Sequence, residues 1–91
     1  MPSIDIQRAH TRSLAEAKNS VQRVADHIAR KFDVVCNWDG NTLDFKRSGV
    51  NGQIKVSHRK IHVTADLGFL LMGLRASVER EINRYLDAEF G

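Results

Sequence analysis

The chain has little from which a disulfide, a membrane anchor or a strongly charged surface could be built. Its single cysteine, Cys36, excludes an internal disulfide and fits a reducing cytoplasm. The longest apolar run, Leu67 to Leu74, is far shorter than the ~20 residues needed to span a bilayer. No basic and apolar segment opens the chain, so we expect no secretory signal and no transmembrane segment. The net charge of +3 permits an anionic partner without requiring one.

The four histidines are not spaced as metal ligands. His58 and His62 are the closest pair, at a separation that binds zinc when both lie on a helix. Here they fall on a turn and a strand, where four residues span roughly 13 Å, so one ion cannot bind both. His10 and His27 are predicted on a loop and on the polar face of a helix. We therefore expect surface histidines, no metal site and no cofactor.

No converging set of catalytic residues is recognisable. Cys36 alternates with Val34 and Trp38, which predicts a buried structural position on a strand rather than a nucleophile. Three carboxylates are predicted on outward strand positions, with no partner group placed for acid–base chemistry: Asp5, Asp44 and Asp66. Because no base, nucleophile and oxyanion donors converge, the sequence predicts a protein that is not an enzyme.

Hydrophobic periodicity indicates five strands and two helices. Alternation of polar and apolar residues predicts strands at residues 3–8, 34–38, 42–47, 50–56 and 60–66. Apolar spacings of three and four predict helices at residues 13–31 and 74–89. The second helix is predicted to bury one face, with Leu71, Leu74, Val78, Ile82, Tyr85 and Leu86. Residues 68–73 are predicted as a turn or a loose first coil, because Gly73 disfavours a helix there.

Short local motifs define where these elements begin and turn. Ser13 and Glu16 form a capping box, in which each residue satisfies the other's backbone N–H. Asp39-Gly40 is the strongest hairpin turn signal, and Ser48-Gly49 is preferred for the following turn. With that turn, Gly52 shares a face with the apolar residues of its strand, where it would mark a bulge or a crowded approach.

The order of elements is therefore β-α-β-β-β-β-α. Four consecutive strands with short turns form an antiparallel meander, and their apolar faces must meet one layer of helices. The fold class is α+β, a two-layer sandwich in which an antiparallel sheet carries two helices on one face. The architecture is similar to a reduced helix-grip fold. Residues 1–91 are predicted to form a single domain.

The apolar run in the last third of the chain is the strongest candidate for a functional surface. Phe69, Leu70, Leu71 and Met72 are consecutive, so no regular element can turn all four into one core. One or two should be exposed, and exposed apolar patches tend to mark interaction surfaces. The alternative is that the run caps one end of the small core. Together with Leu67, these residues are the candidate binding residues.

Nucleic-acid binding is a weaker possibility. Several basic residues bias the outer face of the sheet: Lys46, Lys55, Arg59, Lys60 and His62. A sheet that binds nucleic acid usually presents aromatic side chains on which bases stack. Phe45 is the one aromatic residue in the meander after the Asp39-Gly40 turn, and it is predicted to face inward. An ordinary solvated face is therefore favoured.

Six segments spread along the chain carry a family resemblance. They are Met1-Pro2-Ser3-Ile4-Asp5-Ile6 with His10, Ser13-Leu14-Ala15-Glu16-Ala17, Cys36-Asn37-Trp38-Asp39-Gly40, Phe45-Lys46-Arg47-Ser48-Gly49-Val50, Leu67-Gly68-Phe69-Leu70-Leu71 and Val78-Glu79-Arg80-Glu81-Ile82. They resemble the bacterial family of putative polyhydroxyalkanoic acid system proteins over nearly the whole chain. The resemblance implies a cytoplasmic protein linked to storage-polyester metabolism, and it implies no catalytic residues.

Two functions are hypotheses at this point. The first is a non-enzymatic accessory protein of polyhydroxyalkanoate metabolism that acts through the apolar run. Its partner would be a second copy of the chain in a homodimer, a polyester-metabolising protein, or the granule surface. The alternative is a small helix-grip-like domain that binds an apolar or hydroxyacyl ligand between sheet and helix. Against this alternative, three aromatic side chains could fill that space: Phe32, Trp38 and Phe45.

Overall fold

The computed structural model describes residues 3–91. Met1-Pro2, which open the first family-like segment, lie outside the described residues. The strands are β1 (Ile4–Ala9), β2 (Val35–Asp39), β3 (Thr42–Arg47), β4 (Val50–Val56) and β5 (Lys60–Leu67). The α-helices are α1 (Leu14–Phe32) and α2 (Arg75–Phe90), and a 3₁₀-helix, η1 (Phe69–Leu74), lies between β5 and α2.

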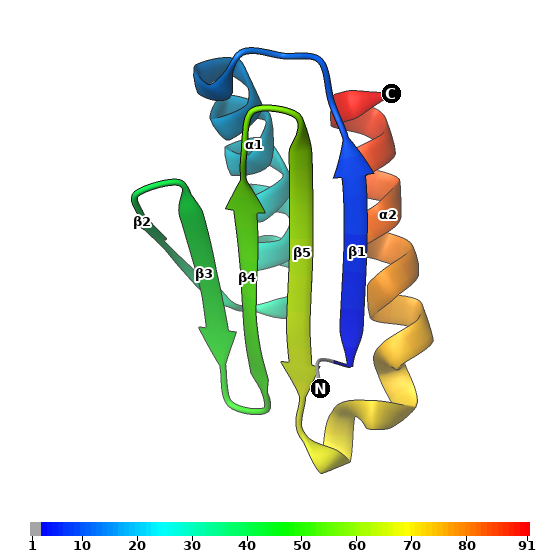
Figure 1. Ribbon diagram of the computed structural model, residues 1–91. Helices are drawn as coiled ribbons and strands as arrows, with labels where there is room; N and C mark the ends of the chain where they lie inside the picture. Colours follow the sequence, from blue (N-terminus) through cyan, green and yellow to red (C-terminus); the bar gives the residue numbers. More distant parts are fainter. Residues whose placement is uncertain (1–2) are drawn as a thin grey trace.

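The five strands form one antiparallel sheet in the order β1-β5-β4-β3-β2. The meander predicted from the sequence is present, and β1 pairs with β5 at its far side, Ile4 opposite Ala65. Both α-helices cover the same face of the sheet, and η1 lies at the end of the sheet where β5 finishes (Figure 1). The predicted α+β two-layer sandwich is confirmed.

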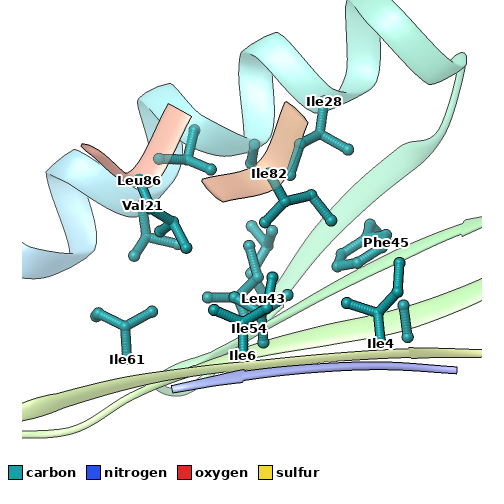
Figure 2. Close-up of a cluster of buried hydrophobic side chains, with 14 of the residues drawn as sticks. Ile4, Ile6, Val21, Ile28, Leu43, Phe45, Ile54, Ile61, Ile82 and Leu86 are labelled. Carbon is teal, nitrogen blue, oxygen red and sulfur yellow. The ribbon is translucent and has the colours of Figure 1, made fainter. Parts of the chain in front are cut away.

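The core lies between the sheet and the two helices (Figure 2). Strand alternation directs Ile4, Phe45 and Ile54 inward, and all three are buried. The helices contribute side chains such as Val21 and Leu86, which are fully buried. Two ion pairs hold α2 in place from outside the core, Arg8 with Asp87 and Arg23 with Glu89, each at 2.7 Å between nitrogen and oxygen.

The capping box at the start of α1 is confirmed. The Ser13 hydroxyl accepts the Glu16 backbone N–H at 3.2 Å, and the Glu16 carboxylate accepts the Ser13 backbone N–H at 3.2 Å. The Ser13 hydroxyl also donates to that carboxylate at 2.9 Å. These bonds from Ser13, side chain first, and then the charge of Arg12 lower the pKa of Glu16 below 4.5.

Replacing Ser13 by alanine is expected to lower the free energy of unfolding by about 1 kcal/mol at pH 7, because α1 loses its cap. A carboxyl with a lowered folded-state pKa stabilises the fold above its unfolded pKa, and that contribution is lost as pH falls through the folded value. Urea titrations at pH 7 and pH 3 should therefore show a smaller cost at pH 3. An equal cost at both pH values would contradict this role for Glu16. Ser77→Ala, at an exposed serine inside α2, is the control.

Three details differ from the sequence prediction. The first hairpin turns at Gly40-Asn41, one residue later than Asp39-Gly40, because Asp39 pairs with Thr42. Residues 69–74 form a 3₁₀-helix rather than a loose coil. Leu74, predicted on the buried face of the last helix, is half exposed, because it ends η1 and a three-residue turn shifts its direction relative to α2.

His10 was predicted on the surface, and this was wrong. It is buried at the end of β1, where Nε2 lies 2.7 Å from the Ser57 carbonyl oxygen. Its Nδ1 accepts the Arg12 backbone N–H at 3.1 Å. His10 therefore pins the β1–α1 connection to the β4–β5 turn. The other three histidines are at least partly exposed, and His62 pairs with Asp5 across the open face of the sheet.

Candidate functional site

The largest exposed apolar side chains of residues 3–91 are concentrated on η1. Phe69 is 91% exposed and Leu70 is 90% exposed. Leu74 and Met72, also on η1, are 54% and 44% exposed, and Val35 on β2 is 66% exposed. Phe69, Leu70, Met72 and Leu74 are called here the apolar tip. They belong to η1, the yellow segment that lies beyond the end of the sheet at the bottom of Figure 1. Such a concentration of exposed apolar area in six residues is typical of an interaction surface.

The β3–β4 turn holds η1 against the sheet. The Gly68 backbone N–H donates to the Gly49 carbonyl oxygen at 2.7 Å. Gly49 has a φ of +84°, a left-handed conformation that favours glycine. A Cβ on Gly49 would lie 2.9 Å from Cδ1 of Leu71, so the leucine packs directly on this turn. Leu71 is thus the inward anchor of η1.

Ser3 fixes the other side of η1. Its hydroxyl accepts the Leu67 backbone N–H at 3.2 Å and donates to the Met72 sulfur at 3.4 Å. Its carbonyl oxygen accepts from Nε of Arg75 at 2.6 Å. The chain segment before β1 therefore joins the end of β5, η1 and the start of α2. The apolar tip is held on an ordered platform.

The structure divides the five candidate binding residues into two groups. Phe69, Leu70 and Met72 point to solvent, whereas Leu67 is buried at the end of β5 and Leu71 packs inward. Leu67 and Leu71 support the surface and do not form it. Leu74 belongs to the exposed group, and sequence reasoning missed it because helical spacing assigned it to the core.

Beside η1, a pocket opens between the sheet and the helices. Its volume is about 200 Å³. Six of its apolar lining residues come from α1, β3, β5, η1 and α2: Ile28, Phe45, Leu67, Leu71, Val78 and Ile82. The three aromatic residues that could have filled this space pack in or against the core but leave the pocket open. Phe32 and Phe45 line the pocket, while the Trp38 indole N–H donates to Oε1 of Gln22 at 2.7 Å.

Three charged residues line the same pocket: Lys31, Asp33 and Arg47. Arg47 follows Leu43 and Phe45 with period two, so its side chain leaves β3 on the helix-covered face. This alternation with Leu43 and Phe45 is the sequence signal that could have identified Arg47 as a pocket residue. Its Nη1 donates to the Phe32 carbonyl oxygen at 3.1 Å. The pocket is therefore apolar inside and has a net positive mouth.

Cys36 is half-buried rather than buried, because β2 is an edge strand. Burial and then the charge of Asp26 raise the pKa of its thiol above 9.0, which disfavours the reactive thiolate. Among residues 3–91, no three metal-ligating side chains gather to hold an ion.

No helix within the described chain is long and apolar enough to cross a membrane.

The comparisons with known proteins give one match. Neither the curated proteins nor the solved structures include a match to this sequence. One family, described as putative polyhydroxyalkanoic acid system protein, matches residues 4–90. Since this match spans almost the entire sequence, the chain belongs to that family, whose name links it to polyhydroxyalkanoate systems.

Proposed function

We propose that this protein is a non-enzymatic, cytoplasmic accessory protein of bacterial polyhydroxyalkanoate metabolism that attaches to the polyester granule through the apolar tip. The observation that carries the proposal is the pair Phe69 and Leu70, both about nine-tenths exposed. Family membership supplies the polyester context. A storage polyester offers an extended apolar surface, against which two such side chains can be buried without a shaped partner.

The expected strength of attachment depends on the area that the apolar tip can bury. Fully burying a Phe or Leu side chain is worth about 1.5–3 kcal/mol. Phe69 and Leu70 together therefore contribute roughly 3–6 kcal/mol, with a smaller share from Met72 and Leu74. A contribution of this size supports reversible attachment rather than permanent anchoring. Because η1 is already ordered by Gly49 and Ser3, little conformational entropy is lost on binding.

The double variant Phe69→Ser, Leu70→Ser is expected to reduce co-sedimentation with isolated polyhydroxyalkanoate granules by about tenfold or more, because it removes most of the buried apolar area. Its thermal unfolding should stay unchanged, since both side chains are exposed. Val35→Ser is the matched control, because Val35 is 66% exposed on β2, away from η1. The control should bind like the wild type.

The same preparations identify the other candidate occupants of the apolar tip. Light scattering that shows a stable dimer, lost in the double variant, would replace the granule with a second copy. Binding only to granules that retain their proteins, and not to purified polyester particles, would replace it with a polyester-metabolising protein. A change at Leu71 is a poorer test, because that side chain packs on Gly49 and its loss would displace η1.

A further inference from the structure

The pocket beside η1 is lined mostly by residues that do not belong to the apolar tip. Phe69, Leu70 and Met72 do not line it, whereas Leu71 and Leu74 do. The pocket and the apolar tip are therefore neighbouring sites that share only Leu74. A ligand in the pocket would be a function beyond granule attachment, and its binding does not depend on that attachment.

The size of the pocket limits what it can hold. A group the size of a water occupies about 30 Å³, and a methylene is similar. The pocket volume of about 200 Å³ therefore accepts roughly six or seven such groups. This is smaller than the ~300 Å³ at which sites for drug-sized ligands begin. A short, slim molecule fits, and a bulky ring system does not.

The apolar side chains that line the inside of the pocket favour an aliphatic chain. Ile28, Val78 and Ile82 face it from the two helices, and Phe45 and Ala65 face it from the sheet. None of these side chains offers a hydrogen bond. A polar group placed among them would lose its water without compensation. The part of the ligand that enters must therefore be hydrocarbon.

The charged residues at the mouth of the pocket favour a ligand with a negative charge at one end of its aliphatic chain. Arg47 donates through Nη1 to the Phe32 carbonyl oxygen and through Nε to the Ser48 carbonyl oxygen at 3.2 Å. These two bonds fix the guanidinium, while its Nη2 has no protein partner among residues 3–91. Lys31 adds a second positive charge and Asp33 one negative charge. A carboxylate is the group best matched to a held guanidinium with an available N–H edge.

We infer that this pocket binds a straight-chain carboxylic acid of about six to eight carbons, with its chain inside and its carboxylate on Arg47. The volume sets the chain length, and the net positive mouth selects the acid. Free fatty acids and short hydroxy acids share this chemistry, because a hydroxyl close to the carboxylate stays at the mouth.

Calorimetric titration with hexanoate, octanoate, decanoate, octanol and octylamine tests the inference. Affinity should rise about fourfold per methylene up to octanoate and then level off, because the pocket is full. Octanol should bind about tenfold more weakly than octanoate, and octylamine more weakly still. Arg47→Gln should weaken octanoate about tenfold. Lys46→Gln is the matched control, since it removes a neighbouring charge from the opposite face of β3 and should change nothing.

Val50→Phe provides a second, independent variant. Val50 lines the pocket and is only partly buried at the start of β4, so a larger ring can enter the pocket without overfilling the buried core. It should abolish octanoate binding. The inference is overturned if octanoate does not bind at millimolar concentration, if octanol binds as tightly as octanoate, or if Val50→Phe binds normally. The variant Phe69→Ser, Leu70→Ser should keep full octanoate affinity, which separates this result from the granule experiment.

Discussion

Replacing Gly52 by alanine is expected to lower the free energy of unfolding by about 2–3 kcal/mol. The Phe45 ring lies directly over Gly52, and an added Cβ would be 2.2 Å from its Cζ and 2.4 Å from Cε2. Phe45 is buried, so the ring can move only toward the neighbouring pocket that it lines. The variant should therefore also weaken octanoate binding. The midpoint of urea unfolding, at unchanged m-value, measures the cost.

Two further variants separate crowding from the general effect of adding a methyl group. A Cβ on Gly73 would meet nothing within 4 Å, so Gly73→Ala should be neutral or stabilise the fold by up to about 1 kcal/mol. In a Phe45→Leu background the ring is gone, and Gly52→Ala should cost less than about 1 kcal/mol. A full cost in that background would show that the contact with Phe45 is not the cause.

Replacing Leu86 by alanine is expected to have the largest effect on stability, about 3–4 kcal/mol. Leu86 is fully buried in the core, where it holds α2 against the sheet and α1. Truncation leaves a cavity, because the removed atoms are enclosed by core side chains from the sheet and both helices. For a domain of this size the unfolding temperature should fall by about 15 °C or more.

The control for Leu86→Ala is the same substitution at Leu74, because Leu74 is half exposed on η1. Leu74→Ala removes the same atoms but leaves no closed cavity, so it should cost less than about 1 kcal/mol. Calorimetry of the two variants compares them directly. Similar losses at the two positions would contradict the burial of Leu86 between α2, α1 and the sheet.

Alternation along the strands predicted much of this fold, because a strand with one buried face needs an apolar side chain at every second residue. It identified Phe45 as inward, and the same face assignment predicted a bulge or a crowded approach at Gly52. The structure shows the crowded approach, with the Phe45 ring against Gly52. The capping box at Ser13 was equally readable, because both partners lie three residues apart. Local signals were sufficient at these positions.

Two of the three failures depend on partners that are distant in sequence, and the third is local. His10 is buried by the Ser57 carbonyl, and nothing in the sequence around His10 indicates that contact. In the first hairpin, Asp39 pairs with Thr42. The turn therefore lies at Gly40-Asn41, one residue later than the Asp-Gly preference predicts. The pocket is the space left after side chains from two helices, η1 and the sheet have packed. A sequence gives the volume of each side chain, but it does not show how closely those side chains pack, and the pocket is the space that their packing leaves empty.

The position of β1 in the sheet has a consequence for folding. Strands β2 to β5 each pair with a neighbour in sequence, whereas β1 is made first and pairs only with β5. Closing the long loop between them costs entropy that the hairpins do not incur, so we expect β1 to join the sheet after the hairpins have formed. Without β1, β5 is an open edge able to recruit another chain. Since Ser3 also fixes Leu67 and Arg75, the pairing of β1 both closes this edge and sets the geometry of the apolar tip.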